Sequence, residues 1–124
     1  MMPSRGARRL LCGWGCLMPL LLLAGCAPAP DDAAAARGQQ LLARYHCGSC
    51  HSIPGVAAAR AQLAPSLQAY GRRSYIAGRL PNRPDTLARW VADPAAVIPG
   101  TLMPNMGVSP ADADDMAAYL SRLQ

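Results

Sequence analysis

The sequence lacks several residue types that most domains of its size contain. Its 124 residues include no Phe, Lys or Glu, and aromatic residues make up 5% of the total. With so few aromatic side chains, the chain has limited apolar bulk for building a core. Its basic residues form no stripe interleaved with aromatics, which argues against a nucleic-acid-binding protein. All the basic residues are Arg and all the acidic residues are Asp. This choice reflects the base composition of the genome rather than a function.

The sequence also lacks a long apolar run. Its most apolar stretch, Leu17 to Leu23, is short of the about 20 residues that a membrane-spanning helix needs. Three arginines precede this stretch, and Leu23-Ala24-Gly25-Cys26 ends it with small residues before a cleavage point. This order is typical of a secretory signal peptide. An uncleaved N-terminal anchor helix is the alternative.

The most informative motif that is present is Cys47-Gly48-Ser49-Cys50-His51. C-x-x-C-H is the attachment signature of c-type haem, because two thiols at this spacing can add to the vinyl groups on one porphyrin edge. The histidine then supplies an axial nitrogen to the iron. A thioredoxin-like dithiol would be expected on a βαβ pattern, which is not visible. A zinc site would need further ligands, and His46 is poorly placed to provide one.

A second axial ligand has two candidates in the downstream loop. Met103 precedes Pro104, whose stiff backbone can aim a thioether, and Met106 follows only three residues later than Met103. A thioether paired with histidine raises the iron's potential relative to two histidines. Either methionine could instead fill the core, since methionine adapts to irregular gaps. The residues alone leave these alternatives open.

Periodicity predicts helices and no convincing strand. We expect a first helix over about residues 33–45, with Asp31 or Asp32 near its start, and a second over 84–92. A last helix should begin at Pro110, with Ser109 as its N-cap. Brief turns are expected near residues 66–70 and 75–77. The apolar faces of these helices would be Gly38, Leu41, Leu42 and Tyr45; Leu87, Trp90 and Val91; and Ala113, Met116, Ala117, Leu120 and Leu123.

The order of these motifs resembles that of class I cytochromes c. The matching segments, in order, are Gly38 with Leu42 and Tyr45, then residues 47–51, 64–67, 90–94, 99–105 and 117–120. The resemblance implies a small all-α fold, with about three main helices and short turns wrapped around one covalent haem. The haem would supply the apolar bulk that the sequence lacks. We therefore expect a cytochrome c domain over residues 37–124.

The same resemblance implies roles for five residues at the haem. Cys47 and Cys50 would bind haem c covalently, and His51 and Met103 would be its axial ligands. The Pro65 carbonyl would accept the Nδ1 proton of His51. With both axial positions filled, the iron would have no open site, so the chain would be an electron carrier and not an enzyme. A gas-binding or peroxidase-like protein is the alternative if Met103 is not a ligand.

The resemblance also assigns residues around the haem and departs from the family in two ways. Gly38 and Tyr119 match positions where the first and last helices cross. Trp90 and either Arg72 or Arg73 match groups that bind an inner haem propionate. The segment from Gly38 to Cys47 is one residue longer than the spacing between these two positions that is common in the family. The lysine ring that surrounds the haem edge in many members has no counterpart.

The ending Leu-Ala-Gly-Cys resembles the lipobox of bacterial lipoproteins. It implies a lipoprotein signal peptide over residues 1–25, a lipid on Cys26, and an Ala/Pro-rich tether over residues 26–36. Cys47 and Cys50 would then be the only other cysteines of the mature chain. Its nine Arg and seven Asp would give a net charge of +2. We expect a monomer, held by lipid on the extracytoplasmic face of a cell membrane, in the periplasm, that exchanges electrons with respiratory proteins, including a terminal oxidase.

Overall fold

The computed structural model describes residues 29–124, which form a mostly helical domain. The long helices are α1 (Pro30–Arg44), α2 (Pro84–Ala92) and α4 (Pro110–Leu120), and α3 (Pro94–Val97) is a single turn. Two 3-10 turns, η1 (Cys47–Ser49) and η2 (Tyr70–Arg72), lie in the first half. The strands β1 (Tyr75–Ile76) and β2 (Leu80–Pro81) form a small antiparallel hairpin, with Ile76 opposite Leu80. The all-α fold predicted from the sequence is confirmed.

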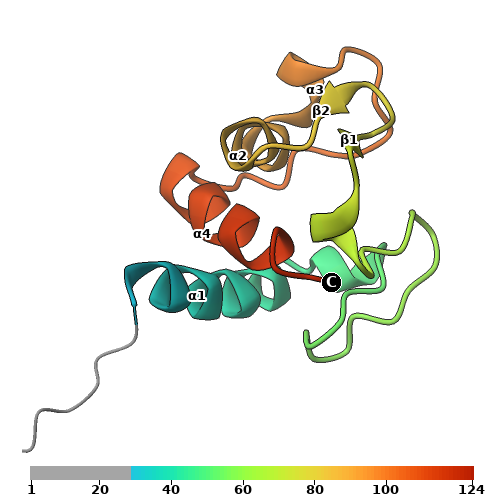
Figure 1. The fold of residues 1–124 in the computed structure, drawn as a ribbon. Coiled ribbons are helices and arrows are strands. Elements are labelled where there is room, and N and C mark those ends of the chain that lie inside the picture. The colour runs from blue at the N-terminus through green and yellow to red at the C-terminus, as the bar shows by residue number, and fades with distance from the viewer. Residues whose placement is uncertain (1–28) are drawn as a thin grey trace, which may run out of the picture.

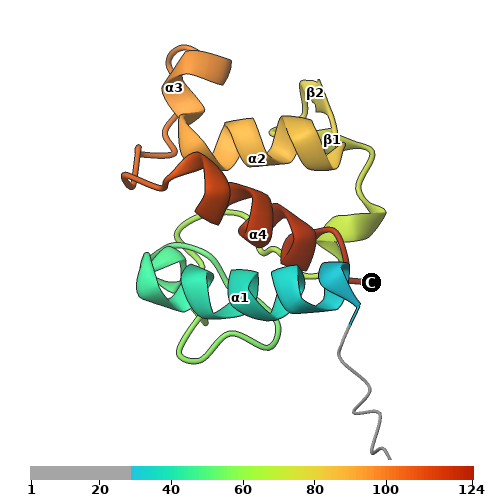
Figure 2. The ribbon, with the colours of Figure 1, turned by 90° about the vertical axis from the view of Figure 1, so that its left-hand side faces the viewer.

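The three long helices are stacked in the order α1, α4, α2 (Figures 1 and 2), so that α4 packs on both neighbours. The α1–α4 crossing depends on Gly38. A β-carbon at this position would overlap the Asp115 carbonyl oxygen and lie 2.6 Å from its carbon and 3.0 Å from the Met116 Cα. Glycine therefore lets the two backbones approach more closely than any other residue would.

Polar contacts reinforce the same crossing at several points. The Arg37 guanidinium donates two hydrogen bonds to the Asp115 carboxylate, at 2.7 and 2.8 Å. The Tyr45 hydroxyl donates to Asp112 Oδ2 at 2.7 Å, and this bond raises the pKa of Tyr45. Together these contacts hold α1 against α4, and the Tyr45 bond places the end of α1, after which the cysteine motif follows.

The core lies between the three helices and uses the apolar faces that the sequence predicts. On α4, Met116 and Ala113 are fully buried and Leu120 is 3% exposed. On α1, Leu42 is 2% exposed, and on α2, Leu87 is 1% exposed. Burial of these faces supplies most of the driving force for helix packing.

The structure also corrects several details of the sequence-based prediction. The first helix begins at Pro30, within the predicted tether, and Asp31 and Asp32 lie in its first turn, near its start as expected. The β1–β2 hairpin and α3 were not predicted, and a 3-10 turn begins at Tyr70, where the predicted turn of residues 66–70 ends. None of the helices described over residues 29–124 is long and apolar enough to cross a membrane.

Candidate functional site

The cysteine motif forms one tight turn directly after α1. His46 adopts a left-handed conformation with φ 56°, which ends the helix and redirects the chain. The backbone N–H of His51 then donates to the Cys47 carbonyl at 3.1 Å, and that of Cys50 donates to the same oxygen at 3.3 Å. Cys47 and His51 are therefore one helical turn apart. Both thiols are free and half-buried.

The loop after the motif folds back against this turn. Ser52 and Arg60 form an antiparallel bridge, and the Ile53 N–H donates to the Ala59 carbonyl at 3.0 Å. A β-carbon at Gly48 would lie 2.6 Å from the Ala59 Cα. Only glycine at this position lets the returning loop pack against the cysteine turn.

The imidazole of His51 is held by the Pro65 carbonyl. Its Nδ1 lies 2.7 Å from that oxygen. Because a carbonyl can only accept, Nδ1 carries a proton, and in the neutral imidazole the lone pair is then on Nε2. Two backbone bonds pin the Pro65 segment to the motif: Ala64 N–H to Cys50 O at 2.9 Å and Leu67 N–H to Ser52 O at 2.8 Å. A ring fixed in this way presents Nε2 as a metal ligand.

The Cys47 thiol lies against the core. Burial raises the pKa of this thiol, so the thiol is protonated at neutral pH. Desolvation favours the uncharged form here, as it does for other cysteines in apolar surroundings. The motif therefore presents a neutral apolar sulfur on its inner side.

Met103 lies on the connection between α3 and α4. It is half-buried and packs against the core cluster, whereas Met106 is 41% exposed. The Thr101 hydroxyl accepts from the Met103 N–H at 3.2 Å, which fixes the backbone just before Pro104. Of the two candidate methionines, Met103 is the one whose side chain turns toward the interior.

The residues expected at a propionate lie in different surroundings. Trp90 is buried on α2 at 8% exposure. The Arg73 guanidinium donates to the Ser66 carbonyl and lies 5.1 Å from the Tyr70 ring centroid. Arg72 is exposed. The propionate roles of Trp90, Arg72 and Arg73 stay predictions.

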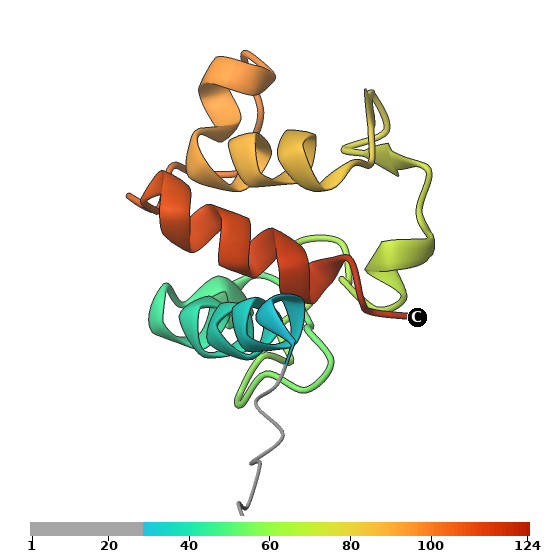
Figure 3. The ribbon, with the colours of Figure 1, turned by 60° about the vertical axis from the view of Figure 1, so that its left-hand side comes forward.

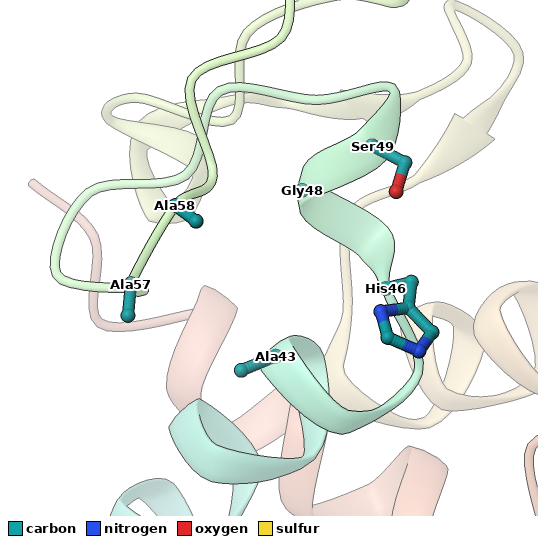
Figure 4. A pocket seen from close by; sticks show the side chains of 6 residues that line it. All are labelled: Ala43, His46, Gly48, Ser49, Ala57 and Ala58. Carbon is teal, nitrogen blue, oxygen red and sulfur yellow. The ribbon is translucent and has the colours of Figure 1, made fainter.

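A hollow of about 170 Å³ lies between the end of α1, the cysteine turn and the returning loop (Figure 4). His46 and Ser49 lie on one side of it, and Ala57 and Ala58 lie on the other. Cys47, Cys50 and His51 do not line it.

A helical domain with a C-x-x-C-H turn and an oriented imidazole is the architecture of a c-type cytochrome. The family model for cytochrome c matches residues 35–124, so the chain belongs to the cytochrome c family. The domain carries haem c and serves electron transfer. The match covers the folded domain apart from the first residues of α1.

Two curated relatives share this domain. One is cytochrome c oxidase subunit 2 of Alkalihalophilus pseudofirmus, 31% identical over 96 residues, which are 77% of this chain and 27% of that protein. The other is cytochrome c oxidase subunit 2 of Bacillus subtilis, 29% identical over 87 residues, which are 68% of this chain and 24% of that protein. This chain therefore spans about a quarter of either relative. No solved structure gave a significant match.

The residues present suit a covalent haem c. The two thiols are reduced and share one turn, and the His51 Nε2 is free to bind iron. No group of three or more His, Cys, Asp or Glu within residues 29–124 could hold a metal ion, and a structural zinc site uses four such ligands. The predicted lipid site, Cys26, and the predicted signal peptide lie outside the described residues.

The structure adds two contributors that the sequence did not reveal. Gly48 admits the loop that carries Ala59, and the Cys50 and Ser52 carbonyls anchor the segment of Pro65. A glycine within C-x-x-C is not informative in a single sequence, because the two middle positions of the motif are variable. Backbone carbonyls leave no trace in a sequence at all.

Proposed function

We propose that this chain is a membrane-tethered carrier of single electrons, with one haem c bound through Cys47 and Cys50 and ligated by His51 and Met103. The bound haem supplies a reversible one-electron couple at its iron. The hydrogen bond from His51 Nδ1 to the Pro65 carbonyl is the observation that carries the proposal. It orients the ring and makes Nε2 a better donor, as expected for an axial ligand.

Met103 is proposed as the other axial ligand because its side chain turns inward and its backbone is restrained. A thioether donor stabilises the reduced iron and raises the potential. With both axial positions filled by protein atoms, no site remains for a substrate, and the chain is proposed to have no enzymatic activity.

The proposed partners are a respiratory donor and a terminal oxidase. Support comes from the two relatives, which are oxidase subunits that contain a domain similar to this chain. In this chain, the corresponding domain would be held at the membrane by lipid on Cys26, on the extracytoplasmic face. Because α1 begins at Pro30, only Ala27 to Ala29 would separate the lipidated residue from the folded domain.

The ligand pair is tested with two methionine variants made as holoproteins. Met103→Ala should abolish the absorption band of the oxidised protein that marks an Fe–S bond, and should lower the potential. Met106→Ala is the matched control and should leave both nearly unchanged. The opposite pattern would identify Met106 as the ligand. A missing band in the unaltered protein, with ready CO binding after reduction, would favour a gas-binding protein instead.

A further inference from the structure

The loop that follows the cysteine motif makes a sharp turn at Pro54 and Gly55. The Val56 N–H donates to the Ile53 carbonyl at 3.3 Å, and Gly55 has a φ of 73°. Proline at the second position of a turn and a glycine with positive φ at the third are typical of a type II turn. Ile53 and Val56 are buried, whereas the two residues between them are exposed. We refer to residues 53–56 as the Pro-Gly turn.

Two side chains from the crossing helices hold the Pro-Gly turn. The Tyr119 hydroxyl of α4 donates to the Pro54 carbonyl at 2.6 Å. The Gln39 amide of α1 donates to the Gly55 carbonyl at 2.5 Å. A β-carbon at Gly55 would overlap the Tyr119 hydroxyl and lie 3.2 Å from Gln39 Nε2. The loop therefore lies directly against both helices, and Figure 3 shows it in green beside α1.

Tyr119 is suited to holding a backbone segment in place. Its ring is half-buried and packs against the core cluster, which fixes the direction of the hydroxyl. Burial raises the pKa of Tyr119, so the hydroxyl keeps its proton and remains a donor. Pro54 is an exposed residue, and water can bind its carbonyl when the hydroxyl is removed. What the tyrosine adds is therefore a fixed position for the turn.

The Pro-Gly turn is connected to the hydrogen bond between His51 and Pro65 by two routes. Along the chain, Ile53 is only two residues after His51. Across the loop, the Ser52 carbonyl accepts from the Leu67 N–H at 2.8 Å, and Leu67 is two residues after Pro65. A movement of the turn would therefore displace both the imidazole and the carbonyl that it binds. Hydrogen bonds weaken steeply when their distance and angle depart from the preferred values.

We propose that Tyr119 is a positioning residue for the His51 imidazole, on which it acts through the Pro-Gly turn. The proposal rests on the proposed function, in which His51 is an axial ligand of the haem iron. The hydrogen bond from Nδ1 to the Pro65 carbonyl increases electron donation by Nε2. Stronger donation stabilises the oxidised iron, so a well-aligned bond lowers the potential. Tyr119 thus tunes the potential from α4, which carries none of the proposed ligands.

The test removes the hydroxyl with Tyr119→Phe, which keeps the ring in the core. The protein is the holoprotein with Cys26→Ser, which removes the predicted lipid site. One readout is the rate at which the Nδ1 proton of His51 exchanges with solvent, measured by NMR on the reduced form. The other is the potential, measured by redox titration. We expect exchange about tenfold faster than in the protein with native Tyr119, and a more positive potential.

A second variant and a control separate positioning from stability. Gln39→Met removes the other bond to the Pro-Gly turn and should change both readouts in the same direction. The control combines Arg37→Ala with Asp115→Ala, which keeps the net charge and removes a contact between α1 and α4 that does not involve the turn. This control should lower Tm. Its exchange rate should change by less than about twofold, because the Nδ1 proton exchanges by local opening, and its potential should not change.

An unchanged exchange rate, or a potential that is unchanged or more negative, in Tyr119→Phe protein would overturn the proposal. The tyrosine would then act on stability alone. Equal acceleration of exchange in Tyr119→Phe protein and in the control would also overturn it, since exchange would then follow global unfolding. If the ring protons of His51 in the reduced protein with native Tyr119 lack the chemical-shift displacement that a haem ring causes, the proposed function is refuted instead. The two failures are therefore distinguishable.

Discussion

Gly38→Ala tests how closely α1 and α4 approach. The added β-carbon would overlap the Asp115 carbonyl oxygen and lie 2.6 Å from its carbon. Apolar carbon contacts are optimal at about 3.5–4.0 Å, so the helices must separate by roughly 1 Å. The obstacle is backbone, which cannot swing aside as a flexible side chain would.

The expected loss of stability follows from two opposing terms. Overpacking of this kind costs about 1–3 kcal/mol. Alanine is a better helix former than glycine by about 1 kcal/mol, which offsets part of the cost. Separation of the helices also loosens the buried contacts of Leu42 and Met116, which places the cost at the upper end of its range. The net loss is therefore about 2 kcal/mol, or roughly a 10 °C fall in Tm for a domain of this size.

The assay is thermal unfolding of the holoprotein followed by far-UV circular dichroism. Gln40→Ala is the matched control, because Gln40 is exposed on the same helix and Ala costs nothing there. This control should melt within about 2 °C of the unaltered protein. A Gly38→Ala protein that melts as high as the unaltered protein would show that helix propensity outweighs the crossing, and would refute the reasoning.

Three further predictions concern other parts of the chain. Gly48→Ala should lower the free energy of unfolding in urea titrations by about 1–3 kcal/mol, because the added β-carbon would lie 2.6 Å from the Ala59 Cα. An unchanged free energy of unfolding would mean that the loop of Ala59 shifts away without cost. Tyr45→Phe should lose the stability that the bond to Asp112 supplies. Since folding raises the pKa of Tyr45, that stability is present below pH 10 and fades above it, so the variant should differ from the unaltered protein at pH 7 and converge with it at high pH. Cys26→Ser should release the protein from membranes in fractionation; continued tight association would favour an anchor helix.

The sequence predicted the long helices well because their local signals were strong. For α2, the predicted bounds agree with the structure, because Pro84 fits the first turn and Leu87, Trp90 and Val91 mark one face. For α4, the Ser109 side chain accepts from the Asp112 N–H, as an N-cap should. The start of α1 was placed too late, because Pro30 fits a first turn as well as an extended tether.

The short elements could not be predicted from one sequence. The strands β1 and β2 have two residues each, too few for an alternating pattern to appear. The single turn of α3 depends on Asp93 accepting from the Ala96 N–H, a contact that many Asp-Pro sequences could make. At the site, the motif indicated Cys47, Cys50 and His51, whose roles stay predictions. The backbone bonds that place Pro65 depend on the tertiary fold and could not be predicted.

The most direct test of the central claim is the pyridine haemochrome spectrum of the protein, produced together with the cytochrome c maturation machinery. We predict one haem per chain, with the spectrum of a haem joined by two thioether bonds. Cys47→Ser should shift that spectrum to the form with a single thioether bond. A protein that is folded and exported but carries no covalent haem would contradict the account.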